Sequence, residues 1–408
     1  MISVAILGHG VVGSGVAEIL LHGAETVEKN AGQSILLKRI LDLRSFPELP
    51  YADRFTTEFD TILQDKDIQI VVETMGGLHP AYDFVKACLL NGKSVVTSNK
   101  ELVAAKGDEL LALARERNLN FLFEASVGGG IPILRPLHQC LAANEIEEIS
   151  GILNGTTNFM LTRMAMDNMD FDTALGLAQQ LGYAERNPSA DVDGHDACRK
   201  ICILAALAYG THVYPEQVYT EGISAITPVD IQYASTLNCV IKLIGKVKKQ
   251  GDKIACMVSP RLVPKDHLLA NVSGVFNAIA VRGNAVGDVL FYGQGAGKDA
   301  TASAVVADVI DEVHHMQTRK PLFWEASDPN LLLPHDQAES AVLLRFDANN
   351  KPALLAAVQE VFGEVSVVSR PGAPCYELAV LTTVMSEEKI NEGLTKLGHQ
   401  PVSRLRLL

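Results

Sequence analysis

Apolar positions in the first part of the chain follow the two-residue period of strands and the wider period of helices in turn. Ser3–Leu7 is a short apolar run that meets a glycine-rich turn and continues into an amphipathic stretch. Further strands are expected at residues 35–43, 68–76, 94–99 and 120–128, with helices at about 80–91 and 102–117. Strands that alternate with helices in this way predict an α/β fold with a parallel sheet covered on both faces.

Two further regions follow along the chain. From about Ile146 to Leu322 strands dominate and helices are interspersed, which is typical of an α+β domain. Residues 321–334 form a proline-containing linker that holds the only tryptophan. The pattern after this linker predicts the order strand, helix, strand, strand, helix, strand, which is that of a small ferredoxin-like module. We therefore predict domains at residues 1–130, 131–322 and 337–408.

Composition narrows the classes of partner. The chain has 408 residues, 48% of them apolar, and a formal net charge of -13. Nucleic acids and anionic membranes need a basic face, so neither partner is expected. Seven cysteines without a CxxC spacing indicate reduced thiols and no zinc site. Because there is no apolar run of about 18 residues and no basic segment before the first strand, we expect a cytoplasmic protein without a membrane span or signal peptide.

A glycine-rich turn joins the first strand to the first helix. Its sequence, Gly8-His9-Gly10-Val11-Val12-Gly13, has the GxGxxG spacing of a Rossmann-type domain. There the first glycine permits a sharp turn, the second lets the pyrophosphate of a dinucleotide approach, and the third brings helix and strand together. The flanking strand and helix supply the context that the motif requires, and a plain glycine turn is the alternative.

The end of the second strand carries opposite charges that bear on the cofactor. Asp42 lies about where an acid usually meets the ribose 2′-hydroxyl of NAD, whereas Arg44 could hold the 2′-phosphate of NADP. Either could also be a solvated loop charge, so the choice between NAD and NADP stays open. A second glycine-rich turn, Gly293–Gly297, precedes a helical run and is either another approach to the cofactor or a plain turn.

Ligands of open parallel sheets bind beyond the carboxyl ends of the strands. Three segments that follow strands, 73–77, 97–100 and 124–130, are therefore expected on one rim together with the glycine turn. Lys100 ends the second of them and could reach a reacting substrate. The alternative is a solvated lysine at the start of a helix, although cations are disfavoured at helix N-termini.

The segment from Leu181 to Lys200 gathers acidic side chains and a lysine around a turn that enters a helix. Asp196 and Lys200 stand at i and i+4 on one face of this helix, which is otherwise apolar nearly all round. Such a spacing is ordinarily a surface ion pair, but a buried pair is costly unless chemistry requires it. A partly desolvated lysine has a lowered pKa and exchanges protons near neutral pH, as making or consuming an alcohol requires.

Seven motifs, in order along essentially the whole chain, resemble those of the homoserine dehydrogenase family. They are GHGVVG, ETMGG, VVTSNKELVAAKG, FEASVGGGIPILRPL, GILNGTTNFMLTRM, LGYAERNPSADVDGHDACRK and YGQGAGKDATASAVVADV. The resemblance implies an NAD(P)-dependent oxidoreductase that interconverts L-homoserine and L-aspartate 4-semialdehyde by hydride transfer, a step toward threonine and methionine. It also implies that residues 131–322 form a catalytic, substrate-binding and dimerisation domain.

The resemblance further implies roles for individual residues. Lys200, Lys100 and Asp196 are the catalytic positions, and Lys200 is assigned the hydroxyl proton over Lys100. The substrate-binding positions are Gly182, Glu185, Asp191 and Asp196. The cofactor-binding positions are Gly8, Gly10, Val11, Val12, Gly13, Asp42, Arg44, Thr97, Ser98, Lys100 and Gly297. A monovalent cation, Na+ or K+, is implied at backbone carbonyls of Glu124, Val127, Gly129 and Ile131.

The C-terminal region resembles an ACT regulatory module, the kind that binds an amino-acid effector. Such modules usually have a glycine after the proline of the first helix, where this chain has Ala353. The alternative is an ACT-like domain that serves only for contacts between subunits. A homodimer or homotetramer is the expectation from the family, and the identity of an effector, threonine or another, stays open.

Two other functions compete with this interpretation. A phosphorylating aldehyde dehydrogenase needs a nucleophilic cysteine, and Cys198 and Cys202 are the thiols nearest to the predicted site. Their apolar neighbours favour buried packing instead. The second rival is a catalytically idle regulator that senses NAD(P) or an amino acid on the same fold. Two proton-handling lysines argue against it.

Overall fold

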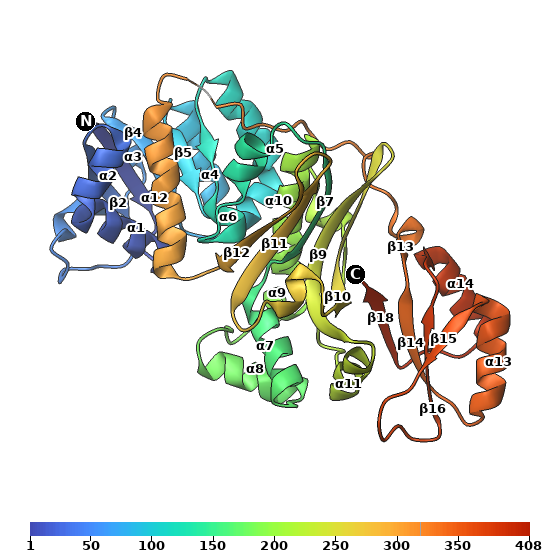
Figure 1. The fold of residues 1–408 in the computed structure, drawn as a ribbon. Coiled ribbons are helices and arrows are strands. Elements are labelled where there is room, and N and C mark those ends of the chain that lie inside the picture. The colour runs from blue at the N-terminus through green and yellow to red at the C-terminus, as the bar shows by residue number, and fades with distance from the viewer. Residues whose placement is uncertain (319) are drawn as a thin grey trace.

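The first domain is built on a six-stranded sheet, in a computed structural model that describes residues 1–318 and 320–408 (Figure 1). All of its neighbouring strands pair in parallel, in the order β3-β2-β1-β4-β5-β6. This is the order of a doubly wound Rossmann-type sheet, so the predicted fold class is confirmed. The strands are β1 (Ile2–Leu7), β2 (Ile35–Leu41), β3 (Phe55–Thr56), β4 (Ile68–Glu73), β5 (Ser94–Thr97) and β6 (Phe121–Leu122).

Helices cover both faces of this sheet because successive strand residues point to opposite sides. Val4 and Ile6 of β1 pack toward α1, α2 and α12, whereas Ala5 and Leu7 face the core shared with α4 and α5. The helices are α1 (Val11–His22), α2 (Ala24–Ala31), α3 (Asp60–Leu63), α4 (Ala81–Leu90), α5 (Lys100–Glu116), α6 (Ala125–Gly128) and α12 (Lys298–His314). Helix α12 returns from far along the chain to complete this domain, although the predicted division at residue 130 leaves it outside; that division stays a prediction.

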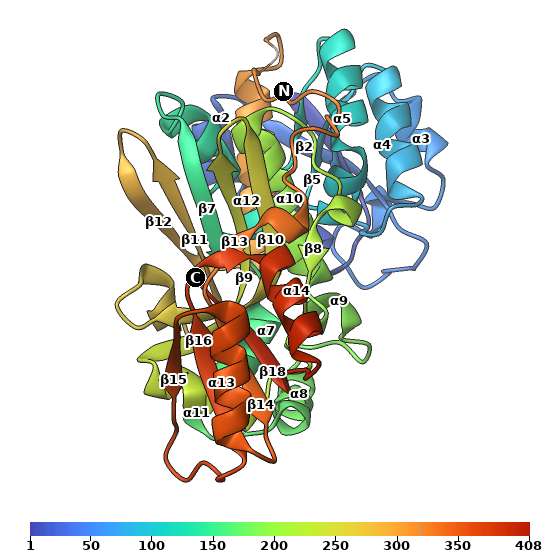
Figure 2. The same cartoon turned by 90° about the vertical axis from the view of Figure 1, so that its right-hand side faces the viewer.

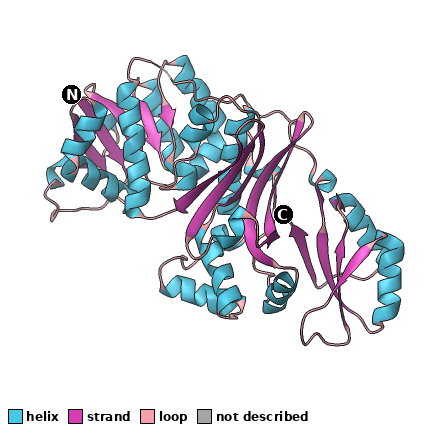
Figure 3. Ribbon diagram, in the orientation of Figure 1, coloured by secondary structure: helices cyan, strands magenta, loops and turns pink. Residues whose placement is uncertain are grey.

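The second domain combines long strands with helices in about equal shares (Figure 3). Its part of the large sheet has the order β12-β11-β7-β9-β10, with long antiparallel hairpins β9–β10 and β11–β12. Helix α10 packs on this sheet, and no helix of the described residues is long and apolar enough to cross a membrane. The elements are β7 (Ile146–Ile152), α7 (Gly155–Met166), α8 (Phe171–Gln180), α9 (Ser189–Val192), α10 (His195–Tyr209), β8 (Tyr219–Thr220), α11 (Pro228–Thr236), β9 (Cys239–Gln250), β10 (Lys253–Pro264), β11 (Phe276–Gly283) and β12 (Gly287–Gln294).

The C-terminal domain has the predicted ferredoxin-like order, with antiparallel strands β18-β14-β16-β15 and two helices (Figure 2). Strand β18 also pairs in parallel with β10 through Arg406 and Arg261, so one sheet continues through both domains. The elements are β13 (Glu339–Ser340), β14 (Val342–Asp347), α13 (Lys351–Phe362), β15 (Val365–Val368), β16 (Glu377–Thr382), β17 (Met385–Ser386), α14 (Glu387–Leu397) and β18 (Ser403–Leu407). A regulatory ACT role for this domain stays a prediction.

Local chemistry moves several boundaries away from the prediction. The strand expected at 120–128 is wrong beyond Leu122, because residues 125–128 form the helical turn α6. The hydroxyl of Ser126 donates to the carbonyl of Phe123 at 2.7 Å, a local bond that favours a turn over a strand. Helix α5 begins two residues earlier than expected because Asn99 caps it: its Oδ1 accepts from the backbone N of Leu102 at 3.1 Å.

Candidate active site

Lys100, Asp196 and Lys200 meet where α5 of the first domain approaches α10 of the second. The Nζ atom of Lys200 lies 2.8 Å from Oδ2 of Asp196, and the Nζ atom of Lys100 lies 2.5 Å from Oδ1. Lys200 also donates to the backbone carbonyl of Leu153 at 2.7 Å. The structure therefore brings the three predicted catalytic side chains together, with one carboxylate between two ammonium groups.

The two lysines differ in burial and in the direction of their pKa shifts. Asp196 and Lys200 are buried, with 3% and 7% exposure, whereas the side chain of Lys100 is 41% exposed. Burial lowers the pKa of Lys200 despite the charge of Asp196. Burial also acts to lower the pKa of Lys100, but the charge of Asp196 outweighs it and the pKa of Lys100 is raised. Asp196 keeps a lowered pKa, because the two lysines outweigh the burial that would raise it.

Asn154 is a site residue that the sequence analysis missed. Its side-chain Nδ2 donates to Oδ2 of Asp196 at 2.9 Å and to Oδ1 of Asp191 at 2.7 Å. Its Oδ1 accepts from the backbone N of Thr157 at 2.8 Å and so caps helix α7. An asparagine just before a helical stretch signals a cap, but its second role depends on α10 and is invisible in the local sequence.

Of the predicted substrate residues, Asp191 lies in this cluster through Asn154. Burial and the charge of Asp196 raise the pKa of Asp191. Gly182 and Glu185 lie on an exposed loop between α8 and α9, and the described residues show no hydrogen bond or ion pair from the Glu185 carboxylate to the lysines. The loop is tied to α7 where the hydroxyl of Thr156 donates to the carbonyl of Tyr183 at 2.6 Å.

A buried carboxylate, Glu73, organises the loops that follow β4 and β5. It accepts hydrogen bonds from the backbone N of Met75 at 2.7 Å and from the hydroxyl of Thr97 at 2.6 Å. Burial raises its pKa. Thr97 in turn accepts from the backbone N of Asn99 at 2.9 Å, so Glu73 helps to place Lys100. The predicted cofactor residue Ser98 is half-buried in the same loop.

The glycine-rich turn borders a cavity of about 520 Å³ at the rim of the first sheet, lined by residues that include Gly8, Gly10, Asp42, Arg44 and Thr74. A methyl group on Gly10 would stand in open space, whereas one on Gly13 would lie 1.9 Å from the carbonyl oxygen of Gly8. Gly10 thus leaves room for a ligand and Gly13 secures the contact of turn and helix, as expected of a dinucleotide site. At the start of α1, Val11 is exposed and Val12 packs on the core.

Asp42 and Arg44 form an ion pair beside this cavity. Both guanidinium and backbone groups of Arg44 donate to the Asp42 carboxylate, and Arg44 Nη2 lies 2.9 Å from Oδ2. The same carboxylate accepts from the backbone N of His9 at 2.8 Å, and Arg44 donates to the carbonyl of His9 at 2.9 Å. The Arg44 guanidinium holds the pKa of Asp42 well below its usual range.

Two further glycine-rich turns meet at the domain boundary. Gly297 is the N-cap residue of α12 with a φ of 124°, and a methyl group there would stand in open space. The backbone N of Gly130 donates to the carbonyl of Gln294 at 3.2 Å. A methyl group on Gly129 would lie 2.2 Å from the carbonyl oxygen of Gly295. The turn of residues 293–297 therefore contacts, through Gln294 and Gly295, the segment implied to bind a cation.

The Glu124 carboxylate is fully engaged inside the protein. It accepts hydrogen bonds from the backbone N of Ile133 at 2.6 Å, of Leu134 at 2.7 Å and of Arg135 at 2.7 Å. Among the described residues no cluster of three His, Cys, Asp or Glu side chains could hold a metal ion. A cation would thus depend on the backbone carbonyls of Glu124, Val127, Gly129 and Ile131, and stays a prediction.

The thiols near the site are packing groups. Cys198 is buried and its sulfur lies 3.6 Å from the carbonyl oxygen of Pro215. Cys202 is fully buried, and burial raises the pKa of its thiol. The raised pKa makes Cys202 a poor nucleophile. The hydrogen bond with Cys202 lowers the pKa of Cys198, so its burial against Pro215 is what speaks against the aldehyde dehydrogenase alternative.

A Rossmann-type sheet with a glycine-rich turn, facing a buried lysine and aspartate across a domain boundary, defines a nicotinamide-dependent oxidoreductase. Models of the family described as homoserine dehydrogenase and of its NAD-binding domain match residues 132–310 and 8–124. The chain is 37% identical to a homoserine dehydrogenase of Pseudomonas aeruginosa over 100% of this chain and 98% of that one. The chain belongs to the homoserine dehydrogenase family.

Solved structures agree with this assignment. A homoserine dehydrogenase from Thiobacillus denitrificans has a TM-score of 0.92 and 38% identity, covering 100% of this chain and 98% of that one. A hyperthermophilic archaeal homoserine dehydrogenase in complex with NADPH has a TM-score of 0.66 and 31% identity, covering 77% of this chain and 98% of that one. The findings support an active enzyme over the idle regulator.

Proposed function

We propose that Lys200 exchanges the hydroxyl proton in the interconversion of L-homoserine and L-aspartate 4-semialdehyde. The observation that carries this role is a buried Nζ atom bound to Asp196 and Leu153, with a lowered pKa. An ammonium has three N–H groups, so one remains for the substrate oxygen beyond these two acceptors. The nicotinamide, when bound, takes the hydride from homoserine or supplies it to the aldehyde.

The proton balance sets the state of Lys200 in each direction. In oxidation the neutral amine of Lys200 takes the hydroxyl proton as the hydride leaves the same carbon. In reduction the ammonium stabilises the negative charge that develops on the carbonyl oxygen and then donates its proton there. Lys100, whose pKa is raised, keeps its charge and holds Asp196 in place.

Carboxylates around this lysine pair suit the ammonium group of the substrate. Asp191 and Asp196 face the cluster through Asn154. Charge-assisted hydrogen bonds to an ammonium are stronger than neutral ones. We place Glu185 and Gly182, from the exposed loop, at the outer side of the same substrate site, with Glu185 as a further acid for the substrate amine.

For the cofactor we propose NADP, with Arg44 as the partner of the 2′-phosphate. The Asp42 carboxylate is already occupied by His9 and Arg44, which leaves it less able to accept the ribose hydroxyls of NAD. The side chain of Arg44 is 62% exposed and lines the cavity, and arginine binds phosphate with a fixed fork of donors. The archaeal relative in complex with NADPH supports this choice.

Four further properties rest on the family resemblance. They are a monovalent cation at the carbonyls of the 124–131 segment, a homodimer or homotetramer, an amino-acid effector at the C-terminal domain, and a cytoplasmic location. Ala353 stands where ACT modules usually have glycine and weighs against the effector.

The proposal is tested by following reduced nicotinamide in absorbance with purified protein, L-homoserine at alkaline pH, and NAD or NADP in separate reactions. Wild type is expected to turn over with preference for NADP, and Lys200→Ala is expected to lose turnover while it still binds the cofactor. Turnover of Lys200→Ala at the wild-type rate would overturn the role of Lys200. A preference of wild type for NAD would overturn the role of Arg44.

A further inference from the structure

The short helix α9, which carries Asp191, ends against a short segment that follows β8. The backbone N of Ile223 donates to the carbonyl of Val192 at 2.8 Å. A methyl group on Gly222 would lie 2.2 Å from that same carbonyl oxygen and 2.6 Å from the Cα atom of Asp193. Since the two backbones are in direct contact, a shift of residues 221–223 moves the turn between α9 and α10.

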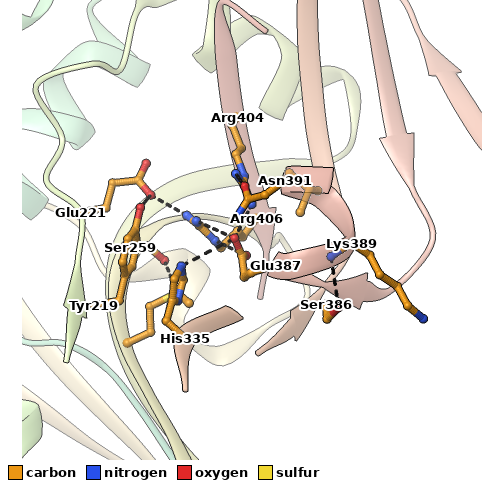
Figure 4. Close-up of polar contacts among 12 residues, drawn as sticks. Tyr219, Glu221, Ser259, His335, Ser386, Glu387, Lys389, Asn391, Arg404 and Arg406 are labelled. Carbon is orange, nitrogen blue, oxygen red and sulfur yellow. Dashed lines mark hydrogen bonds and ion pairs between the residues drawn. The ribbon is translucent and has the colours of Figure 1, made fainter. Parts of the chain in front are cut away.

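Glu221 anchors this segment through both its backbone and its side chain. Its backbone N donates to the carbonyl of Val258 in β10 at 2.8 Å. Its carboxylate points toward the C-terminal domain, where Nη1 of Arg406 lies 2.5 Å from Oε2 (Figure 4). A side chain of the last strand therefore binds residues 221–223, the segment that contacts the end of α9.

Arg406 is itself held rigidly. It is 1% exposed and its Nε donates to Oε1 of Glu387 at 2.7 Å, with Nη2 at 3.2 Å from Oε2. Its backbone belongs to β18, between β10 and β14. The fork to Glu387 fixes the guanidinium plane, so the direction of Nη1 toward Glu221 is fixed as well.

We infer that Arg406 and Glu221 are positioning residues of the substrate site, through which the C-terminal domain sets the place of Asp191. Neither residue touches the reacting groups. The inference rests on the proposed function, because it requires Asp191 to bind substrate. The simpler alternative is that Arg406 only docks the C-terminal domain onto the second domain.

Arg404 provides a matched control for that alternative. It also binds the Glu387 carboxylate, and its Nη1 donates to Oδ1 of Asn391 at 2.8 Å (Figure 4). Both partners lie in α14 of the C-terminal domain. Arg404→Gln therefore disturbs the same carboxylate as a change at Arg406 but leaves the contact between Arg406 and Glu221 in place.

The test compares steady-state kinetics of the full-length Glu221→Gln, Arg406→Lys, Arg404→Gln and Asp191→Asn variants, with thermal unfolding measured alongside. For Glu221→Gln and Arg406→Lys we expect the KM for homoserine to rise about three- to tenfold, because these side chains act on the site without contact to its ligand. We expect kcat and the KM for NADP to stay within about twofold, and Arg404→Gln to leave all three within the same range.

The outcomes separate the inference from the proposed function. An unchanged homoserine KM in Glu221→Gln, or an equal rise in Arg404→Gln, would overturn the inference. Glu221→Gln removes one charge from a side chain that is 33% exposed, so it tests the claim even if Arg406→Lys fails to fold. If Asp191→Asn leaves the homoserine KM unchanged, the proposed substrate site itself fails.

Discussion

The Nζ atom of Lys100 lies 2.5 Å from Oδ1 of Asp196, and this ion pair joins α5 of the Rossmann-type domain to α10 of the second domain. The same carboxylate binds Lys200 at 2.8 Å. Two cations on one buried carboxylate keep it ionised, and of the two lysines only Lys200 has a lowered pKa. The domain boundary thus carries the charges that the proposed proton exchange uses.

Asp196→Asn removes the only formal negative charge in contact with either lysine at this boundary, among the described residues. Breaking a buried pair by removing one partner costs about 3–5 kcal/mol of stability, so we expect a marked fall in the free energy of unfolding together with loss of kcat. Denaturant unfolding and steady-state kinetics measure the two effects. Asp193→Asn is the matched control, because Asp193 is exposed on the same turn and makes no ion pair among the described residues; equal losses in both variants would contradict the prediction.

Asn154→Ala removes two donors to carboxylates and one helix cap. We expect a stability loss of about 1 kcal/mol from the cap, together with a raised KM for homoserine because Asp191 and Asp196 lose their shared partner. The control is Asn350→Ala, which removes the cap of α13 in the C-terminal domain. It should cost similar stability and leave the homoserine KM unchanged. A rise in KM in both variants, or in neither, would count against the bridging role of Asn154.

Arg44→Ala tests the choice of cofactor. Hydrogen bonds to charged groups contribute about 1.5–3 kcal/mol, so loss of a 2′-phosphate partner should raise the KM for NADP roughly ten- to hundredfold. The KM for NAD should change little, and it serves as the internal control. Asp42→Ala, in contrast, should weaken both cofactors, because Asp42 also holds the glycine-rich turn through the backbone N of His9. Equal effects of Arg44→Ala on both cofactors would contradict this assignment.

Sequence reasoning found the parts of the site that have a local signature. The spacing of Asp196 and Lys200 puts both on one helix face, and the end of β5 puts Lys100 on the rim of the sheet. Asn154 was missed because its contacts reach 37 and 42 residues along the chain, to Asp191 and Asp196. An asparagine before a helix predicts a helix cap but does not predict contacts with residues so far along the chain.

The fold was predictable to a similar depth. Alternating strands and helices gave the parallel sheet, and the C-terminal pattern gave the ferredoxin-like order. The apolar run at Phe121 continued into residues predicted as strand, because a short apolar run does not distinguish a strand from a buried helical turn. The return of α12 to the first sheet was missed for another reason. Its apolar face fits any buried sheet, and its actual partners include Val16 and Ile6.

The most direct test of the account is the pH dependence of kcat for homoserine oxidation in wild type, Lys200→Met and Lys100→Met. Oxidation needs neutral Lys200, so wild-type kcat should rise with pH through a pKa below that of an ordinary lysine. Reduction needs the ammonium of Lys200, so kcat for reduction should fall as the pH rises. The charge of Lys100 lowers the pKa of Lys200, so Lys100→Met should raise that pKa. The rising limb of the kcat profile should therefore remain in Lys100→Met but shift to higher pH.

Lys200→Met should lose the limb and about 10²- to 10⁴-fold in kcat, the usual contribution of a general acid or base. Retention of cofactor binding by Lys200→Met is the control for folding. A rising limb that persists in Lys200→Met, or that disappears in Lys100→Met, would contradict the assignment of the proton to Lys200.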